Sequence, residues 1–487
     1  MESANSIAWL ALLAWAPFTL VLFARLRAPL AATISIFGAQ AFLPNGLAFD
    51  APLVPPLDRE VIAVVSSFIG CVLFAPSFSA GKTPGRGIEM FALLMVLGAV
   101  GTALTNGDAI YFGVKYLAPL SAADIVSLSG GAVLSFWLPF YLGRCLFRKA
   151  GDLRIVLGAL AVGAFFYSVL VLWEIRMSPN LHVDLYGYSA ARFLQAKRGG
   201  IWGWRPMVFV GHGLQLTMFL LTCTLAAGAL WRMRSTMLSG PLRLAAPYLY
   251  GVLFLCQSLA SFVYGTVALL ALLLFRTSFQ AYVILAIALI VLTYPVTRAL
   301  DLFPTESILQ AFERVDPDRA DSLEFRFDNE DLLIERASER ALFGWGGYGR
   351  SRLYDEDSGD RAVVTDGYWV IVLGQRGIVG FLTVFGLLVS PVLVAARALM
   401  RGRPNTREAI LVAGTTWIGA VCAVDLLPNA SITSGTVYLM GGLLGAVQGW
   451  RAGADAPKPR VEETPPVAAQ EVPVSGPRLH GSLRELQ

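Results

Sequence analysis

Long apolar runs, separated by short polar segments, follow one another along almost the whole chain. A helix needs roughly 20 apolar residues to cross a bilayer, and runs of about 17 to 22 recur from one end of the chain to the other. Their centres are expected near residues 15, 36, 69, 98, 132, 165, 218, 250, 269, 289, 387, 418 and 442. The pattern predicts an all-α, polytopic membrane protein with about 12 to 13 transmembrane helices.

The pair of centres near 250 and 269 is the hardest to separate. The apolar run from Leu244 to Phe275 is too long for one span and short for two. Gln257, Ser258 and Ser261 add polar groups near its middle. We therefore expect a tight or partly re-entrant hairpin there.

Composition supports a membrane protein and excludes other classes. The 487 residues are 56% hydrophobic and 15% charged, whereas soluble domains carry about 25% charged residues. The net charge of +4 is small, so no nucleic-acid partner is predicted. The five cysteines lie singly in or beside apolar runs, which predicts neither a disulfide framework nor a zinc site. The first run, Ile7 to Phe23, is followed by Arg25 and Arg27, the reverse of the charge order of a cleaved signal, so we expect a retained helix.

Basic residues cluster in alternate loops, which assigns these loops to the cytoplasm by the positive-inside rule. The amino terminus is then expected outside and the carboxyl terminus inside. This organisation places any chemistry in the long polar loop at the outer face of the membrane. The parts of the chain are an N-terminal helix bundle (1–298), a long outer loop with an amphipathic helix (299–368), C-terminal transmembrane helices (369–451) and a disordered cytoplasmic tail (452–487).

Two loops on the outer side carry basic residues against this rule. One runs from Met177 to Arg205 and includes Arg198; the other runs from Arg298 to Tyr368. Basic residues there work against the topology. An anionic ligand handled at the outer face is the simplest physical reason for them.

The first of these loops ends in Arg205-Pro206 and then His212. Proline suits the first turn of a helix, so Arg205 is expected at the start of a helix, with His212 two turns later inside it. The alternatives are an interfacial arginine that snorkels to the surface, and a histidine that is hydrogen-bonded to a neighbouring helix.

The second loop contains an amphipathic helix candidate. Arg326, Glu330, Leu333, Ala337 and Arg340 recur at helical spacing and share one face. Arg326 would then present a guanidinium that Glu330, one turn further on, orients. The alternative is a solvated charged face. The glycine-rich stretch that follows, FGWGGYGR, lacks the Lys-Ser or Lys-Thr of a P-loop, so nucleotide binding is not expected.

Two charged residues mark the return to the membrane. Asp366 either caps the helix expected to start at Gly367 or presents a carboxylate at the membrane surface. Counting about 20 residues back from Arg397, where the apolar run ends, places Arg376 at the outer boundary of the span. An arginine at that depth is costly unless it faces a wet cavity or a partner, which makes Arg376 a site candidate.

In this order the motifs resemble the O-antigen polymerase and ligase superfamily, over about residues 190–400. Members of that family are bacterial inner-membrane glycosyltransferases with a GT-C-type helical fold. The residues that carry the resemblance are Arg205-Pro206, His212, Arg326 on a helix, LFGWGGYG from Leu342, Tyr368-Trp369 and the glycine spacing from Gly374 to Gly380.

The resemblance implies transfer of a glycan from an undecaprenyl diphosphate carrier to a sugar hydroxyl, with neither metal nor cofactor. Arg205 and Arg326 would clamp the diphosphate, with Arg376 as a third cation. Asp366 would be the general base, at the position where ligases commonly carry histidine. Further substrate-binding candidates are His212, Glu330, Arg198, Tyr368 and Trp369.

A second difference lies at Ser261 to Gly265, where relatives often carry Ser-Arg-Gly and this chain has no arginine. Together with the aspartate in place of histidine, this difference favours a polymerase of surface or secreted polysaccharide over a ligase to lipid A core. The expected partners are the carrier-linked donor, a glycan acceptor, the bilayer and, as a candidate, a chain-length regulator. A transporter or carrier flippase is the alternative of another class. Such proteins usually show internal repeats, which this sequence lacks. A purely structural component is the third alternative, against which the outer arginines argue.

Overall fold

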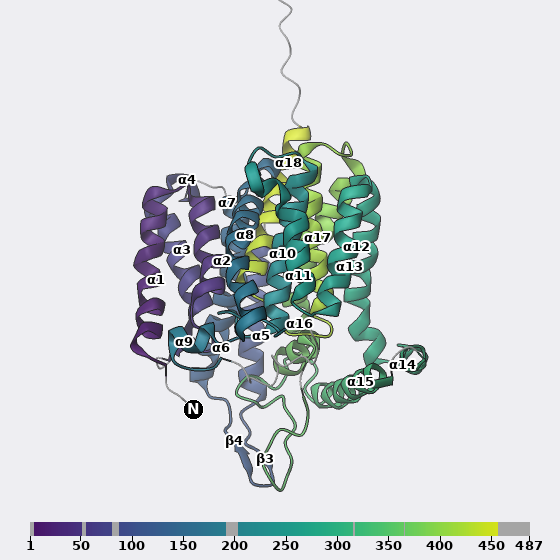
Figure 1. The fold of residues 1–487 in the computed structure, drawn as a ribbon. Helices are drawn as coiled ribbons and strands as arrows, with labels where there is room; N and C mark the ends of the chain where they lie inside the picture. Colours follow the sequence, from purple (N-terminus) through teal and green to yellow (C-terminus); the bar gives the residue numbers. More distant parts are fainter. Residues whose placement is uncertain are drawn as a thin grey trace, which may run out of the picture.

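The computed structural model of the protein describes residues 4–50, 55–79, 87–190, 203–314, 317–364 and 366–455. Its helices run back and forth between the two ends of one bundle (Figure 1). In the first half these are α1 (Ser6–Arg25), α2 (Ala28–Phe42), α3 (Arg59–Phe74), α4 (Pro76–Ser79), α5 (Gly87–Thr105), α6 (Ala122–Ala132), α7 (Leu138–Leu146), α8 (Leu153–Met177) and α9 (Leu181–Tyr186).

The second half continues the same arrangement. Its helices are α10 (Gly213–Arg232), α11 (Ala245–Leu255), α12 (Leu259–Leu274), α13 (Thr277–Ala299), α14 (Thr305–Glu313), α15 (Pro317–Ser338), α16 (Tyr368–Arg401), α17 (Arg407–Asp425) and α18 (Ser434–Asp455). Short 3-10 or π turns precede α7, α8 and α11: η1 (Val133–Trp137), η2 (Ala150–Asp152) and η4 (Gly240–Leu244). Two small antiparallel hairpins complete the fold: β1 (Ala48–Phe49) with β2 (Leu57–Asp58), and β3 (Ile110–Phe112) with β4 (Lys115–Leu117).

The helical prediction is confirmed at every predicted centre, because all of them fall inside helices. Among the described residues, seven helices are long and apolar enough to cross a membrane, and four shorter helices are apolar as well. The expected hairpin near residue 257 is present as α11 and α12, with Gln257 at a φ of 56° between them. The chain is an all-α polytopic membrane protein.

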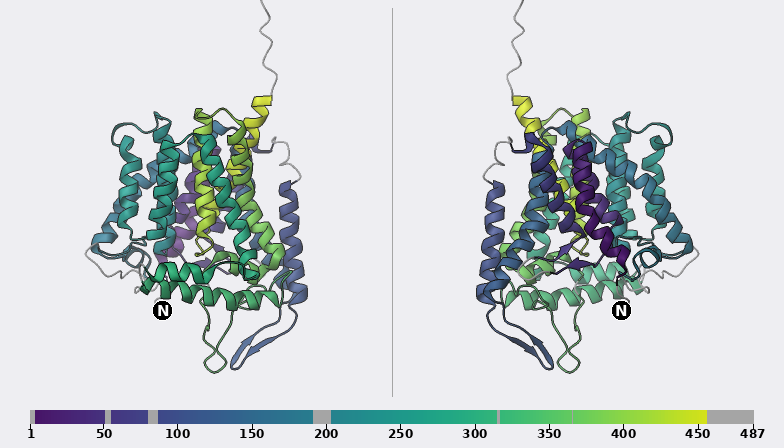
Figure 2. Two further views of the ribbon diagram at one scale, coloured as in Figure 1. Left: turned by 90° about the vertical axis from the view of Figure 1, so that its right-hand side faces the viewer. Right: turned by 90° about the vertical axis from the view of Figure 1, so that its left-hand side faces the viewer.

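The loops separate into two sets at opposite ends of the bundle (Figures 1 and 2). The α15 end carries the start of α1, the β3–β4 hairpin, α9, α14 and α15. The α4 end carries α4 and the end of α18. The loop predicted at 299–368 therefore contains two helices, and the tail predicted from 452 lies, from residue 456 on, outside the described residues.

Helices α10 and α17 form the most enclosed part of the bundle. Small residues allow other helices to approach one another closely, as is common in membranes. On α18, a Cβ at Gly441 would lie 2.0 Å from the carbonyl oxygen of Phe140, and one at Gly445 would lie 2.4 Å from that of Arg144. Glycine at these positions lets α18 pack directly against α7.

The helix expected to start at Pro206 does not start there, because α10 begins only at Gly213. The backbone before it is irregular and buried, and charged side chains satisfy its polar groups. The Glu174 carboxylate accepts hydrogen bonds from the amides of Met207 and Val208, at 2.8 and 2.7 Å. The Arg59 guanidinium donates to the carbonyls of Phe209 and Val210. Non-helical backbone is tolerated at this depth only when protein groups satisfy it in this way.

Helix α16 is broken at Gly377, whose φ of 62° and ψ of −165° are not helical. The glycine-rich turn before α16 satisfies the freed backbone groups on both sides of the break. The amide of Ile378 donates to the Ala341 carbonyl at 2.8 Å, and the amide of Trp345 donates to the Gly374 carbonyl at 2.8 Å. The glycine spacing near residue 377 is therefore the signature of a break in the helix.

Candidate functional site

A cavity of about 340 Å³ lies between α15 and the end of the helix bundle. Helix α15 contributes Arg326 and Glu330 to its lining, and the segment just before α16 contributes Asp366. Most of the remaining wall is apolar or aromatic, including Tyr264, Tyr294, Phe303, Ile308, Phe312, Leu323, Phe325, Val370 and Leu427. The cavity thus joins a few charged groups to an apolar wall at the α15 end.

The charged pair in this cavity is Arg326 and Asp366. The Arg326 Nε lies 3.8 Å from the Asp366 Oδ2, and the two side chains are 38% and 44% exposed. An exposed pair at this distance contributes little to stability. Both groups remain open to a ligand.

Asp366 does not cap helix α16, so that alternative is wrong. The residue at the cap is Gly367, and no side chain caps it. The first amides of the helix donate instead to the end of α17: that of Tyr368 donates to the Leu426 carbonyl at 3.0 Å and to the Asn429 carbonyl at 3.2 Å. The Asp366 carboxylate is free of the capping role and faces Arg326.

Glu330 does not orient Arg326 as expected. Its carboxylate accepts hydrogen bonds from the Tyr294 hydroxyl at 2.9 Å, the Arg298 guanidinium at 3.3 Å and the Trp369 indole at 3.3 Å. Burial raises the pKa of Glu330 above its ordinary value, and the hydrogen bond from Tyr294 and the charge of Arg298 oppose that shift. Glu330 therefore links α13, α15 and α16 at the wall of the cavity.

The shared face of α15 is confirmed. Glu330, Leu333 and Ala337 are buried, whereas Asp328 and Glu335 on other faces are exposed. Proline at the first position of α15 suits a helix start. The helix lies across the α15 end of the bundle (Figure 2).

Tyr368 and Trp369 are the first two residues of α16, directly after the segment that carries Asp366. Trp369 is fully buried, and its ring meets that of Tyr294 edge-on with centroids 5.5 Å apart. The ring of Tyr368 lies 6.4 Å from that of Phe385. Trp369 therefore packs the start of α16 against α13, and Tyr368 packs it against the part of α16 that follows the break.

Arg376 is the last residue before the break in α16 at Gly377. Its guanidinium lies 5.1 Å from the centre of the Phe136 ring, and a ring face attracts a cation at this distance. Phe136 belongs to η1, a π-helical turn inside the α6–α7 span. Arg376 lines a separate, smaller cavity of about 60 Å³ with Thr102 and Thr383.

Arg205 and His212 lie together at the start of α10. Arg205 is 3% exposed, and a Cβ at Gly213 would come within 2.6 Å of its Nε. The His212 side chain caps α10, where its Nδ1 accepts from the Leu214 amide at 3.2 Å. Within the described part of the chain, neither Arg205 nor Arg376 lines the cavity of Arg326 and Asp366. Arg198 lies outside the described residues.

One residue missed by sequence reasoning is Arg298, at the end of α13. It is 4% exposed, and its Nη2 lies 2.6 Å from the Asp331 Oδ1. The sequence held one signal for this role: Arg298 ends a predicted span, and a loop helix with adjacent acidic residues follows it. Arg298 therefore pairs with Glu330 and Asp331 and holds α15 against the bundle.

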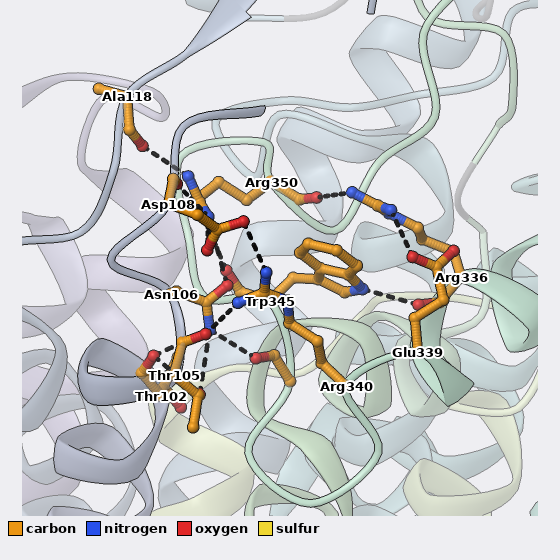
Figure 3. A network of polar contacts seen from close by, with 11 residues as sticks. Thr102, Thr105, Asn106, Asp108, Ala118, Arg336, Glu339, Arg340, Trp345 and Arg350 are labelled. Carbon is orange, nitrogen blue, oxygen red and sulfur yellow. Dashed lines mark hydrogen bonds and ion pairs between the residues drawn. The ribbon is translucent and has the colours of Figure 1, made fainter. Parts of the chain in front are cut away.

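A second group of charges was also missed, and Figure 3 shows it. Trp345 of the glycine-rich turn lies against two guanidinium groups, those of Arg336 at 3.4 Å and Arg340 at 4.1 Å from the ring centre. Arg340 also pairs with Asp108 at 2.7 Å. Arg350 is fully buried beside them. These arginines fasten the glycine-rich turn to the end of α5.

No group of three or more His, Cys, Asp or Glu side chains among the described residues is placed to hold a metal ion. No family model matches the chain, and no curated protein is significantly similar to it.

Proposed function

We propose that the protein is a membrane glycosyltransferase of the O-antigen polymerase and ligase type. It acts on oligosaccharide repeat units carried by undecaprenyl diphosphate, with polymerisation favoured over transfer to lipid A core. In this proposal the protein has a GT-C-like helical fold and lies in the bacterial inner membrane, with the α15 end toward the periplasm. The observation that carries it is the accessible Arg326–Asp366 pair in a largely apolar cavity under a surface helix.

The chemistry assigns one role to each charged group. The acceptor hydroxyl oxygen attacks the anomeric carbon of the donor, and the bond from that carbon to the diphosphate breaks. Asp366 takes the hydroxyl proton as general base. Arg326 turns from Asp366 to the diphosphate and neutralises the charge that develops on this leaving group, for which a guanidinium fork is suited.

The apolar wall fits the other half of a carrier-linked donor. Phe303, Ile308 and Phe312 border the cavity where α14 approaches it. Cavities of about 300 to 1,000 Å³ commonly hold a small-molecule group with a few polar anchors. A polyprenyl diphosphate has this combination of an anionic head and an apolar chain.

Deletion of the gene followed by analysis of surface glycans tests the proposal. Accumulation of single carrier-linked repeat units supports a polymerase, and unattached full-length polymer identifies a ligase. Unchanged glycan with a transport defect would reject both enzyme assignments and support a transporter.

A further inference from the structure

A second cavity, of about 900 Å³, opens at the α4 end, far from Arg326 and Asp366. It lies between the end of α10, the η4 turn and the end of α12. Its charged lining residues are Arg232, Arg234 and Arg243, and no acidic residue is among the described residues that line it. The rest of the lining is Leu230, Trp231, Ser235, Thr236, Leu238, Ser239, Leu273 and Leu274.

The three arginines differ in how they are engaged. Arg232 is tied into the fold, because its Nη2 donates to the Asn405 Oδ1 at 2.7 Å and its Nη1 donates to the Leu272 carbonyl. Arg234 and Arg243 are exposed. Neither guanidinium forms a hydrogen bond or ion pair with the part of the chain that the structure describes. Two cationic groups are therefore available at the mouth of the cavity.

The backbone at Arg234 gives an independent indication. Arg234 has a φ of 50°, in the left-handed region, directly after α10. The amide of Ser235 donates to the Leu230 carbonyl at 3.0 Å, and that of Arg234 donates to the Trp231 carbonyl at 2.9 Å. This is the hydrogen-bond pattern of a helix ending at which glycine is the usual residue. An arginine is less favourable than glycine in this conformation, so the chain keeps a positive charge at the mouth of the cavity where the turn alone would favour glycine.

One wall of the cavity continues onto the lipid-facing surface. Leu274 is 72% exposed and Trp231 is 43% exposed. Tryptophan is enriched where the hydrocarbon core meets the headgroups. Arg154 adds a further positive charge next to the cavity, because its Nη2 donates at 2.9 Å to the hydroxyl of Thr236, a lining residue. The cavity therefore offers cations at headgroup level and an apolar wall toward the chains.

We propose that this cavity binds the phosphate of an anionic phospholipid of the surrounding bilayer. Arg234 and Arg243 hold the phosphate oxygens, and the acyl chains lie along Trp231 and Leu274. Basic pockets between transmembrane helices recognise anionic headgroups in this way. The site is independent of the chemistry proposed at the α15 end.

The test is native mass spectrometry of the full chain in detergent, titrated with phosphatidylglycerol or with phosphatidylcholine. The double variant Arg234→Gly/Arg243→Gln removes both charges, and glycine suits the turn at 234. The matched control, Arg401→Gln/Arg403→Gln, removes two exposed charges at the same end. We expect the first variant to bind phosphatidylglycerol roughly tenfold or more weakly, the control to bind it like the wild type, and phosphatidylcholine to bind weakly to all three.

Several outcomes overturn the proposal. Equal phosphatidylglycerol affinity in wild type and site variant removes the site, and equal loss in both variants indicates general surface charge. Phosphatidylcholine has the same phosphate with a choline cation beside it, so equal affinity for this lipid would contradict selection of a headgroup with net negative charge. Displacement by inorganic phosphate at concentrations equal to those of the lipid indicates a free-anion site. If the double variant does not fold, the single variant Arg243→Gln is subject to the same comparison.

Discussion

Two arginines near the α15 end show how differently the same side chain is used. Arg350 is fully buried, and all three of its guanidinium nitrogens donate to neighbouring residues. Arg326 is 38% exposed and has one ion pair, at 3.8 Å from Asp366. The first guanidinium is saturated by protein groups, whereas the second keeps donors for a ligand. Arginines at the α15 end are therefore used in two ways: Arg350 holds loops together, and Arg326 leaves hydrogen-bond donors open to a cavity.

Replacement of Arg350 by alanine is expected to have the largest effect on stability. It would leave the Ala118 carbonyl and the Oδ1 of the buried Asn106 side chain without these donors. A buried polar group that loses its partner costs about 1 to 3 kcal/mol of unfolding free energy, and the loss of the large buried side chain adds to this cost. Thermal unfolding of the purified protein in detergent measures it.

Arg361→Ala, at an exposed position in the same loop region, is the control and is expected to change stability by less than about 0.5 kcal/mol. Equal losses in the two variants would contradict a structural role for Arg350.

The next largest effect is expected for Arg205→Ala. Arg205 is buried against Gly213 at the start of α10, so its removal leaves a void there and should cost about 2 to 3 kcal/mol. Protein level and melting temperature should fall together. A variant that folds like the wild type but forms no product would instead give Arg205 a direct role at the substrate.

A smaller, pH-dependent effect is expected for Glu330→Gln. Burial raises the pKa of Glu330 above its ordinary 4.5. The stability that protonation contributes is therefore complete below pH 4.5 and is lost as the pH rises through the folded-state pKa.

The melting temperature of the wild type minus that of Glu330→Gln should thus decrease between about pH 4 and pH 8. Glu335→Gln, an exposed change on the same helix, controls for surface charge. A constant difference across this range would show that Glu330 does not titrate with folding.

The smallest effect on stability is expected for Arg326→Ala, which removes an exposed and long ion pair. The change should stay within about 0.5 kcal/mol, while product formation should fall at least about a hundredfold if the guanidinium stabilises the leaving group. Melting temperature and glycan yield, measured on the same preparations, separate the two. A loss of stability as large as that of Arg350→Ala would remove the contrast between the two arginines.

Much of the fold could be predicted from apolar periodicity, because about 20 apolar residues have few uses other than crossing a membrane. The shared helical face of Arg326, Glu330 and Leu333 could also be predicted, because the spacing of these residues along the chain defines it.

The residues with which each charged side chain pairs could not be predicted, because the pairing depends on contacts between segments far apart in the chain. Spacing on one helix suggested that Glu330 would orient Arg326. In the structure, α13 brings Arg298 to Glu330, and the segment before α16 brings Asp366 to Arg326. Pro206 suggested a helix start, but Glu174 and Arg59 satisfy an irregular backbone there. The burial of Arg350 has no local signal, since it depends on the end of α5.

The central claim is tested most directly by Asp366→Asn, which keeps the shape of the side chain and removes its basicity. Carrier-linked glycans would be extracted from cells that express this variant at wild-type level and compared with those of wild-type cells. The account predicts accumulation of single carrier-linked repeat units and loss of polymer, with an unchanged melting temperature of the purified protein. Wild-type polymer in cells that carry only Asp366→Asn would contradict it.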